Sequence, residues 1–207
     1  MNRAYQIGVR WEPRADLDFW LRYDRLYRLP STDEIASYQG FPLSEPFNAE
    51  LKAETGNNYE LGGEYRIDGW KLRGNGFLQQ LTGEIGYDFQ KNLNVNFTDT
   101  QRLGSEIEIS YQKHIWEMKL HYTQMEATFR SGEYDGRKIY LVPEQEFSAV
   151  LSIRPHKNFT LQAEYQYTGS SYEGNDFLNE KEQLPSYAVT NLLCATNRNL
   201  TFHFICG

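Results

Sequence analysis

The chain has 207 residues, of which 28 are acidic and 21 basic, so its formal net charge is −7. Taken alone, this composition is that of an ordinary acidic soluble domain of one or two units. Helical membrane spans are excluded, because no run approaches the roughly 18 consecutive apolar residues of such a helix. The excess of acidic over basic residues gives little support to nucleic-acid binding.

The first two predicted strands cover residues 5–11 and 16–29, and a short turn at residues 12–16 joins them. In the second strand an apolar set alternates with a polar set that carries both signs of charge. The apolar set is Leu17, Phe19, Leu21, Tyr23, Tyr27 and Leu29, and the polar set is Asp18, Arg22, Asp24 and Arg28. A period of two predicts a β-strand. Trp20 lies on the polar face, so it does not fit a simple interfacial girdle.

The same alternation continues along the rest of the chain. Clear segments lie at residues 59–67, 106–112, 116–123, 147–153 and 159–167. Short turns are predicted at residues 67–70, 112–115 and 154–158, and long polar connections at residues 30–58, 84–99, 131–146 and 169–185. Short and long connections therefore take turns, which is typical of an up-and-down barrel in an outer membrane.

Strand length separates this barrel from a soluble sandwich. Sandwich strands usually have about 5 to 6 residues, whereas a strand that crosses a membrane needs roughly 9 to 11. Several segments here reach ten or more residues. The aromatic content of 15% suits interfacial girdles, although it also suits any β-sandwich. We therefore predict an all-β fold, an antiparallel up-and-down transmembrane β-barrel.

The number of predicted strands decides how much of a barrel is present. Nine strands are clear, and residues 200–204 can form a tenth. An open sheet edge is untenable in hydrocarbon, where every backbone group needs a partner. The sheet must therefore close at this small size or belong to a larger barrel, and the loop lengths favour the larger barrel.

Six strings resemble, in their order, the barrel of TonB-dependent outer-membrane receptors. Asn96, Gly104, Glu106 and Glu108 match a spaced N, G, E and E pattern of that family. The strings are YDRLYRLPSTDEI (23–35), LKAETGNNYELGGEY (51–65), FLQQLTGEIGYD (77–88), NVNFTDTQRLGSEIEISY (94–111), LVPEQEFSAVLSI (141–153) and LPSYAVTNL (184–192). Ala53 stands where the family usually has proline.

The resemblance implies a C-terminal portion, nine or ten strands, of a 22-stranded barrel whose lumen holds a plug domain. It also implies uptake of a ferric siderophore, haem or cobalamin across a Gram-negative outer membrane. The implied partners are outer-membrane lipid, the ligand, and the TonB complex acting through the plug. We expect residues 1–207 to form a single partial barrel segment without plug or signal peptide, since residues 1–9 lack an apolar core.

The last residues depart from the family pattern. Residues 193–207 are predicted to be a truncated or frame-shifted tail, although Leu200, Phe202 and Phe204 can still extend the wall. Cys194 and Cys206 both lie in this tail, and a disulfide between them is one reading.

Ligand contacts are expected in the long loops. Aromatic side chains there can stack on a catecholate, haem or corrin, and arginines can bind an anionic chelate. The candidates are Tyr38, Phe41, Tyr87, Arg130, Tyr134, Arg137, Tyr140 and Tyr172. The alternative is that these aromatic residues pack the loops together or mark the outer interface.

No enzyme, cofactor or metal site is expected. Glu106 and Glu108 share a face, as a catalytic acid and base do, but the family pattern accounts for them. The four histidines lack metal-ligand spacing, and no phosphate loop or nucleophile elbow occurs. Two other readings stay open: a complete small outer-membrane barrel, porin-like or of the lipase or protease kind, and a soluble β-rich binding module.

Overall fold

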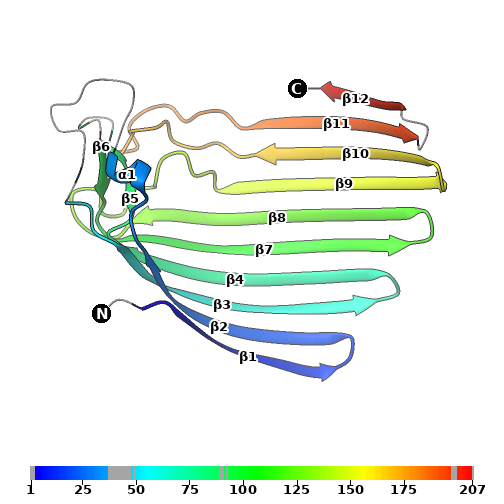
Figure 1. Cartoon of the computed structure of the whole chain (residues 1–207), viewed down its shortest axis with the longest axis horizontal. Helices are drawn as coiled ribbons and strands as arrows, with labels where there is room; N and C mark the ends of the chain where they lie inside the picture. The colour runs from blue at the N-terminus through cyan, green and yellow to red at the C-terminus, as the bar shows by residue number, and fades with distance from the viewer. Residues whose placement is uncertain are drawn as a thin grey trace.

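A single antiparallel sheet dominates the computed structural model, which describes residues 3–36, 48, 50–88, 91 and 93–196 and the backbone of 200–206. Ten strands follow one another in chain order across this sheet (Figure 1). They are β1 (Tyr5–Arg14), β2 (Leu17–Arg28), β3 (Glu54–Ile67), β4 (Trp70–Thr82), β7 (Thr100–Lys113), β8 (Trp116–Phe129), β9 (Gln145–His156), β10 (Phe159–Thr168), β11 (Tyr187–Thr196) and β12 (Leu200–Cys206). The predicted all-β antiparallel fold is confirmed.

A separate hairpin and one short helix stand between the long strands. The hairpin consists of β5 (Ile85–Asp88) and β6 (Leu93–Asn96), and the helix α1 covers Thr32–Ala36. With five residues, α1 is far too short to span a membrane, and no other helix of the described residues qualifies. The hairpin lies within the long polar connection predicted at residues 84–99, which therefore contains regular structure of its own.

The start of β3 also differs from the prediction, which kept residues 54–58 in a loop. Thr55 to Asn58 pair with β2 on one side and with β4 on the other. Their Gly-Asn-Asn composition favours a turn, but backbone pairing on both sides overrides that weak preference.

The predicted short turns are confirmed, and one shows why its residues are there. Asp68 and Gly69 have φ angles of 45° and 87°, as the tight hairpin turn between β3 and β4 requires. A Cβ atom on Gly69 would also lie 2.8 Å from the Gln112 carbonyl oxygen of the neighbouring hairpin. Glycine is therefore needed at this position for both conformation and space.

The two faces of the sheet have the opposite burial to those of a soluble protein. On the outer face, which carries the alternating apolar residues, Ile7 is 62% exposed and Leu61 is 63% exposed. On the inner face Asp18 is 3% exposed and Glu60 is 9% exposed. Large aliphatic side chains thus point to the surroundings while carboxylates are buried, as a wall between lipid and a polar lumen requires.

Ion pairs satisfy the buried acids of the inner face. The Asp18 carboxylate accepts hydrogen bonds from Arg10 at 3.0 Å and Arg66 at 3.2 Å. Trp20 belongs to a second group of polar contacts on this face, because its indole N–H donates to Glu60 at 2.7 Å. The Arg73 guanidinium also lies 4.7 Å from the Trp20 ring. This explains why a tryptophan stands on the polar side of β2.

The outermost strands β1 and β12 each pair with one neighbour among the described residues. The sheet is therefore open at both edges. A small closed barrel would require β1 to pair with β12, and the described residues of these strands do not pair. Residues 200–206 do extend the wall, as the sequence allowed.

The backbone register of β11 and β12 bears on the disulfide reading. Cys194 lies opposite Phe202 and is a free thiol, whereas Cys206 lies opposite Thr190. The two cysteines are thus offset by four positions along the paired strands, about 13 Å at the usual strand rise. A disulfide requires Cα atoms within about 7 Å, so the disulfide reading was wrong.

Candidate functional site

The long connections gather at one end of the sheet and the short turns at the other (Figure 1). The long-connection end carries α1, the β5–β6 hairpin and residues 131–144 and 169–186, which join β8 to β9 and β10 to β11. The candidate ligand residues that the structure describes all belong to this end; they are Tyr87, Arg130, Tyr134, Arg137, Tyr140 and Tyr172. It is therefore where a ligand-binding site is sought.

Five aromatic rings form a small second core that joins three of these connections. Phe177 stacks on Tyr134 with ring centroids 4.7 Å apart, meets Tyr140 edge-on at 5.1 Å and lies 5.6 Å from Phe97. Phe129, at the end of β8, packs against Tyr134 at 5.7 Å. Phe129 and Phe177 are 1% and 5% exposed. We call these five residues the aromatic cluster.

Tyr140 also fixes the hairpin to this cluster. Its hydroxyl donates a hydrogen bond of 3.0 Å to the backbone oxygen of Tyr87 in β5. Burial, together with the nearby carboxylates of Asp88 and Glu84, raises the pKa of Tyr140 to about 12. The phenol consequently stays protonated and keeps this hydrogen bond at any physiological pH.

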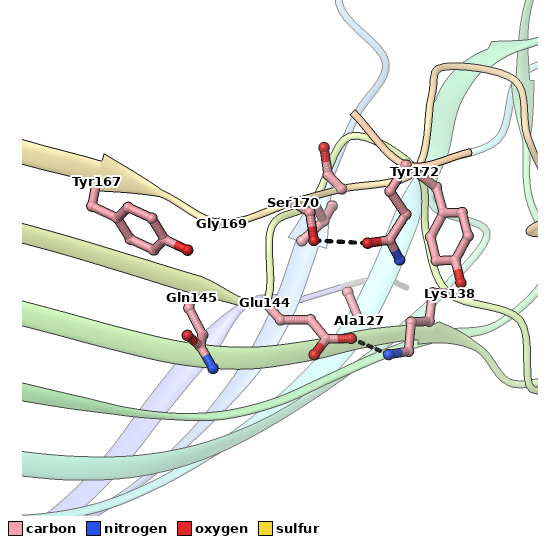
Figure 2. Close-up of a pocket in the computed structure, with 11 residues that line it drawn as sticks. Ala127, Lys138, Glu144, Gln145, Tyr167, Gly169, Ser170 and Tyr172 are labelled. Atoms are coloured by element: carbon pink, nitrogen blue, oxygen red, sulfur yellow. Dashed lines mark hydrogen bonds and ion pairs between the residues drawn. The ribbon is translucent and has the colours of Figure 1, made fainter. Parts of the chain in front are cut away.

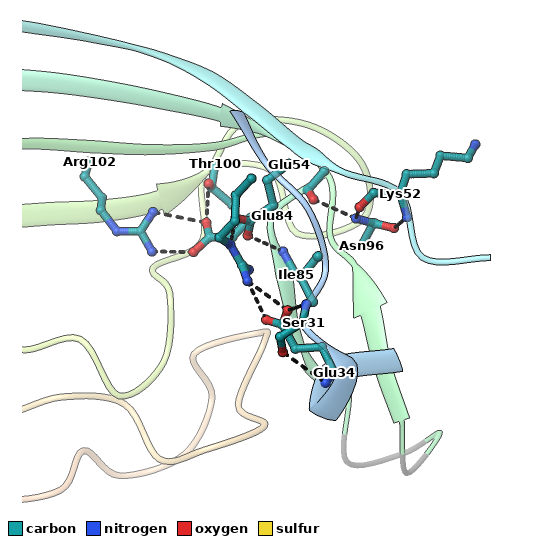
Figure 3. Close-up of polar contacts among 11 residues, drawn as sticks. Ser31, Glu34, Lys52, Glu54, Glu84, Ile85, Asn96, Thr100 and Arg102 are labelled. Atoms are coloured by element: carbon teal, nitrogen blue, oxygen red, sulfur yellow. Dashed lines mark hydrogen bonds and ion pairs between the residues drawn. The ribbon is translucent and has the colours of Figure 1, made fainter. Parts of the chain in front are cut away.

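Two carboxylates hold the base of the hairpin (Figure 3). Glu84 accepts hydrogen bonds from the Thr100 hydroxyl at 2.5 Å and from both terminal nitrogens of Arg102, at 2.6 and 3.0 Å. Glu54 accepts from the Ile85 amide at 2.6 Å and from Arg28 at 2.5 Å. The hairpin is thereby tied to β2, β3 and β7.

Asn96, one of the residues that match the receptor pattern, completes this attachment. Its side-chain amide donates to the carbonyl oxygens of Lys52 and Gly83 at 2.9 and 2.7 Å, and its oxygen accepts from the Lys52 amide at 2.7 Å. Gly104 has a packing role, because a Cβ atom there would lie 2.7 Å from the Phe77 ring. Both positions of the pattern are therefore explained by the architecture of the wall.

Helix α1 joins the same group of polar contacts through its first turn. The Ser31 hydroxyl accepts from the Glu34 amide at 3.3 Å, and the Glu34 carboxylate accepts from the Ser31 amide at 2.7 Å. This reciprocal arrangement is a capping box. Glu34 also pairs with Arg28 at 2.8 Å, so α1 is connected to the end of β2.

We expect Glu84→Ala to loosen the β5–β6 hairpin. Thr100 is 1% exposed, so the substitution would leave a buried hydroxyl without its acceptor, at a cost of about 1–3 kcal/mol. Hydrogen exchange of the Ile85 and Phe97 amides should accelerate by roughly tenfold or more. Glu173→Ala, which breaks an exposed ion pair with Lys181, is the control and should leave that exchange unchanged. Unchanged exchange in Glu84→Ala would contradict the assigned role.

The structure places the candidate ligand residues in two different settings. Tyr134 and Tyr140 belong to the aromatic cluster, with Tyr87 beside them, and Tyr172 lines a pocket between two connections. Arg130 and Arg137 are exposed. Within the described ranges their guanidinium groups make no hydrogen bond or ion pair, and only their backbones are held. Tyr38 and Phe41 lie outside the described residues.

Sequence reasoning missed the groups that hold this end together. Phe177 and Glu84 make their key contacts with residues distant in the chain. Nothing in their local sequence marks them. The sequence did mark Asn96, through its place in the receptor pattern, and Tyr134 and Tyr140, as loop aromatic residues.

Two pockets accompany these contacts. One, of about 240 Å³, lies on the inner face. Its lining residues are Arg22, Glu60, Arg73, Asn75, Glu106, Glu108 and His121. Glu106 accepts a hydrogen bond of 3.2 Å from Asn75, and Glu108 lies 3.8 Å from Lys71.

No group of metal-binding side chains occurs in the described part of the chain. The second pocket, between residues 131–144 and 169–186, is shown in Figure 2.

The fold has counterparts among solved structures. The ferric-catecholate import receptor Fiu from Escherichia coli K12 is 18% identical, with a TM-score of 0.71 over 97% of this chain and 29% of the receptor. The copper transporter OprC is 16% identical, with a TM-score of 0.72 over 96% and 32%. The ferric yersiniabactin uptake receptor FyuA from Yersinia pestis is 18% identical, with a TM-score of 0.70 over 93% and 30%. At these identities the likeness shows the fold alone.

The chain spans about a third or less of the length of these structures. No curated protein matches it. The family model described as "TonB dependent receptor-like, beta-barrel" matches residues 2–202, nearly the whole chain. The chain therefore belongs to the TonB-dependent receptor-like β-barrel family.

Proposed function

We propose that this chain is part of the barrel wall of a TonB-dependent receptor in a Gram-negative outer membrane, which takes up a ferric siderophore or a similar scarce nutrient. The observation that carries this proposal is the reversed burial of the two sheet faces. Leu61 and Ile7 are exposed on one face of the sheet, and Asp18 and Glu60 are buried on the other. A soluble binding module would have buried the aliphatic residues and exposed the acids.

The partners follow from the two faces. Lipid contacts the outer face, and a plug domain elsewhere in the receptor meets the charged inner face and transmits the action of the TonB complex. The similar structures include importers of ferric complexes and a copper transporter. Their cargo supports a metal complex as the class of ligand.

The contacts at the outer end favour an anionic chelate over a free cation. Arg130 and Arg137 lie close together, because the Phe129 amide bonds to the Arg137 carbonyl oxygen at 2.9 Å. Two exposed guanidinium groups at this end can form charge-assisted hydrogen bonds to an anionic ligand. Tyr87, Tyr134 and Tyr140 support the loops that present these arginines, and the remaining candidates, Tyr38, Phe41 and Tyr172, stay proposals for aromatic contacts.

We expect the double variant Arg130→Gln, Arg137→Gln to bind an anionic iron chelate at least tenfold more weakly, with its outer-membrane level unchanged. The probe is ferric enterobactin, and the readouts are its affinity for the intact receptor and radioactive iron uptake by cells. Arg154→Gln serves as the matched control, because Arg154 lies at the short-turn end, where it pairs with Glu117 at 3.1 Å. Full affinity in the double variant would remove the two arginines from the site.

Cells that lack the receptor test the function itself. They should lose uptake of at least one member of a panel of ferric catecholates, ferric citrate and cupric ion. Normal uptake of the whole panel would refute the proposed uptake of a ferric siderophore or a similar metal nutrient.

A further inference from the structure

The lining of the pocket in Figure 2 includes neither Arg130 nor Arg137, and its chemistry differs from that of two exposed guanidinium groups. Its volume is about 330 Å³, at the lower end of the range of small-ligand sites. Most of its lining side chains are uncharged and polar. The lining residues are Ala127, Lys138, Val142, Glu144, Gln145, Tyr167, Gly169, Ser170, Ser171, Tyr172 and Gln183.

The only charged side chains in the lining neutralise one another. The Lys138 ammonium group donates to the Glu144 carboxylate, and the dashed line in Figure 2 marks this pair. That hydrogen bond raises the pKa of Lys138, and the Glu126 carboxylate contributes to the same shift. An anionic ligand would therefore have to compete with two carboxylates for one cation. This pocket disfavours anions.

The remaining polar groups suit hydroxyl groups of a ligand. Among the described residues, the side chains of Gln145, Tyr167, Ser171 and Tyr172 have no hydrogen-bond partner, so they are free to bind one. Ser170 donates to the Gln183 side-chain oxygen at 2.7 Å, which leaves the Gln183 amide hydrogens free to donate. Amides and hydroxyls both donate and accept hydrogen bonds, as sugar hydroxyls do.

Two tyrosines supply flat apolar surface beside these groups. Tyr167 and Tyr172 lie on opposite sides of the pocket in Figure 2, with Ser170 between them. A tyrosine ring can cover an apolar C–H face of a ligand at low conformational cost, and the tyrosine hydroxyl remains available for hydrogen bonds.

The walls of the pocket are held in place without a ligand. The Asn179 side chain both accepts from the Lys138 amide at 2.7 Å and donates to the Lys138 carbonyl oxygen at 3.0 Å. The Tyr172 carbonyl oxygen accepts from the Leu141 amide at 2.9 Å, and that of Ser171 accepts from the Leu184 amide at 2.8 Å. A ligand would therefore bind a preformed site and lose little loop entropy.

We propose that this pocket binds a neutral saccharide of one or two rings, either free or as the headgroup of a membrane glycolipid. The site does not depend on which nutrient the receptor takes up. Its neutral electrostatics, its free amide and hydroxyl groups and its two tyrosines together specify the ligand class.

The test uses the full-length protein in a detergent without a sugar headgroup, titrated with maltose, glucose and glucuronate. We expect maltose or glucose to bind with a millimolar or lower dissociation constant, and glucuronate to bind at least tenfold more weakly. Tyr167→Ala and Tyr172→Ala should each weaken the sugar at least fivefold. Tyr165→Ala, on the same strand but outside the lining, is the control. Absence of sugar binding, equal binding of glucuronate, or indifference to both tyrosine variants would each overturn the proposal.

Two further arms complete the test. The double variant Lys138→Gln, Glu144→Gln should still bind maltose. Loss of maltose binding in a folded double variant would mean that the ion pair itself recognises the sugar, and this would contradict the proposal. Dodecyl maltoside added to the same micelles separates the sources: tighter binding than free maltose indicates a glycolipid headgroup, and equal or weaker binding indicates a free sugar. Either result supports the saccharide class.

Discussion

Replacing Leu61 by arginine is expected to prevent stable insertion of this wall into a membrane. Leu61 lies near the middle of β3, is 63% exposed and faces Leu21 of β2 across the outer face. A positive charge on the lipid side of a barrel near the bilayer midplane costs about 2–4 kcal/mol. That is a large part of the roughly 5–15 kcal/mol by which a typical protein is stable. Folding into lipid vesicles, followed by gel mobility with and without heating, measures the effect.

The matched control puts the same charge on the inner face. Thr123 lies opposite Glu106 in the β7–β8 pairing and opposite Glu146 in the β8–β9 pairing, so the guanidinium of Thr123→Arg meets carboxylates. We expect this variant to insert normally. If Leu61→Arg inserted as well as Thr123→Arg, the assignment of the outer face to lipid would be wrong.

Phe177→Ala is expected to separate the long connections at this end of the sheet from one another. Phe177 is 5% exposed and touches Phe97, Tyr134 and Tyr140, which come from two different connections. Truncating a buried phenylalanine typically costs about 3–5 kcal/mol. The long strands do not depend on these contacts, so the loss should be confined to the loops. Limited proteolysis and hydrogen exchange over residues 131–144 and 169–186 measure it.

Leu178→Ala is the control for that experiment. Leu178 is the next residue in the chain and is 40% exposed, so its truncation should leave loop protection close to that of the parent. Phe177→Leu should recover part of the protection because it fills much of the volume. Equal protection in Phe177→Ala and the parent would mean that the connections are held by other contacts.

Much of the wall could be predicted from the sequence because the side-chain period of a strand is local. The alternation in residues 17–28 placed Leu21 and Arg22 on opposite faces, and β2 has this arrangement. The boundaries were less certain where composition and pairing disagree. Asn57 and Asn58 favour a turn, yet they form part of β3 because strands β2 and β4 bond to both of their sides.

The candidate site could be predicted only in part. Alternation and loop composition brought attention to Tyr134 and Tyr140, but not to their partner Phe177, which lies more than 35 residues further along. The aromatic cluster gives these tyrosines a structural role, which was the alternative reading of the sequence. Arg130 and Arg137 remain candidates for ligand contact because their side chains are exposed and without partners in the described ranges.

Residue types and their spacing were enough to infer the class of fold, the two faces of each long strand, the alternation of short and long connections, and the resemblance to the receptor family. These properties depend on residue type and on spacing within one strand or between neighbouring strands. The tertiary structure decided which residues tie the outer connections together, why Trp20 stands on the polar face and where a neutral pocket forms. Those outcomes depend on contacts such as Glu84 with Arg102, Trp20 with Glu60 and Asn179 with Lys138. Each contact joins residues that only the register of the folded sheet and the packing of its loops bring within hydrogen-bond distance.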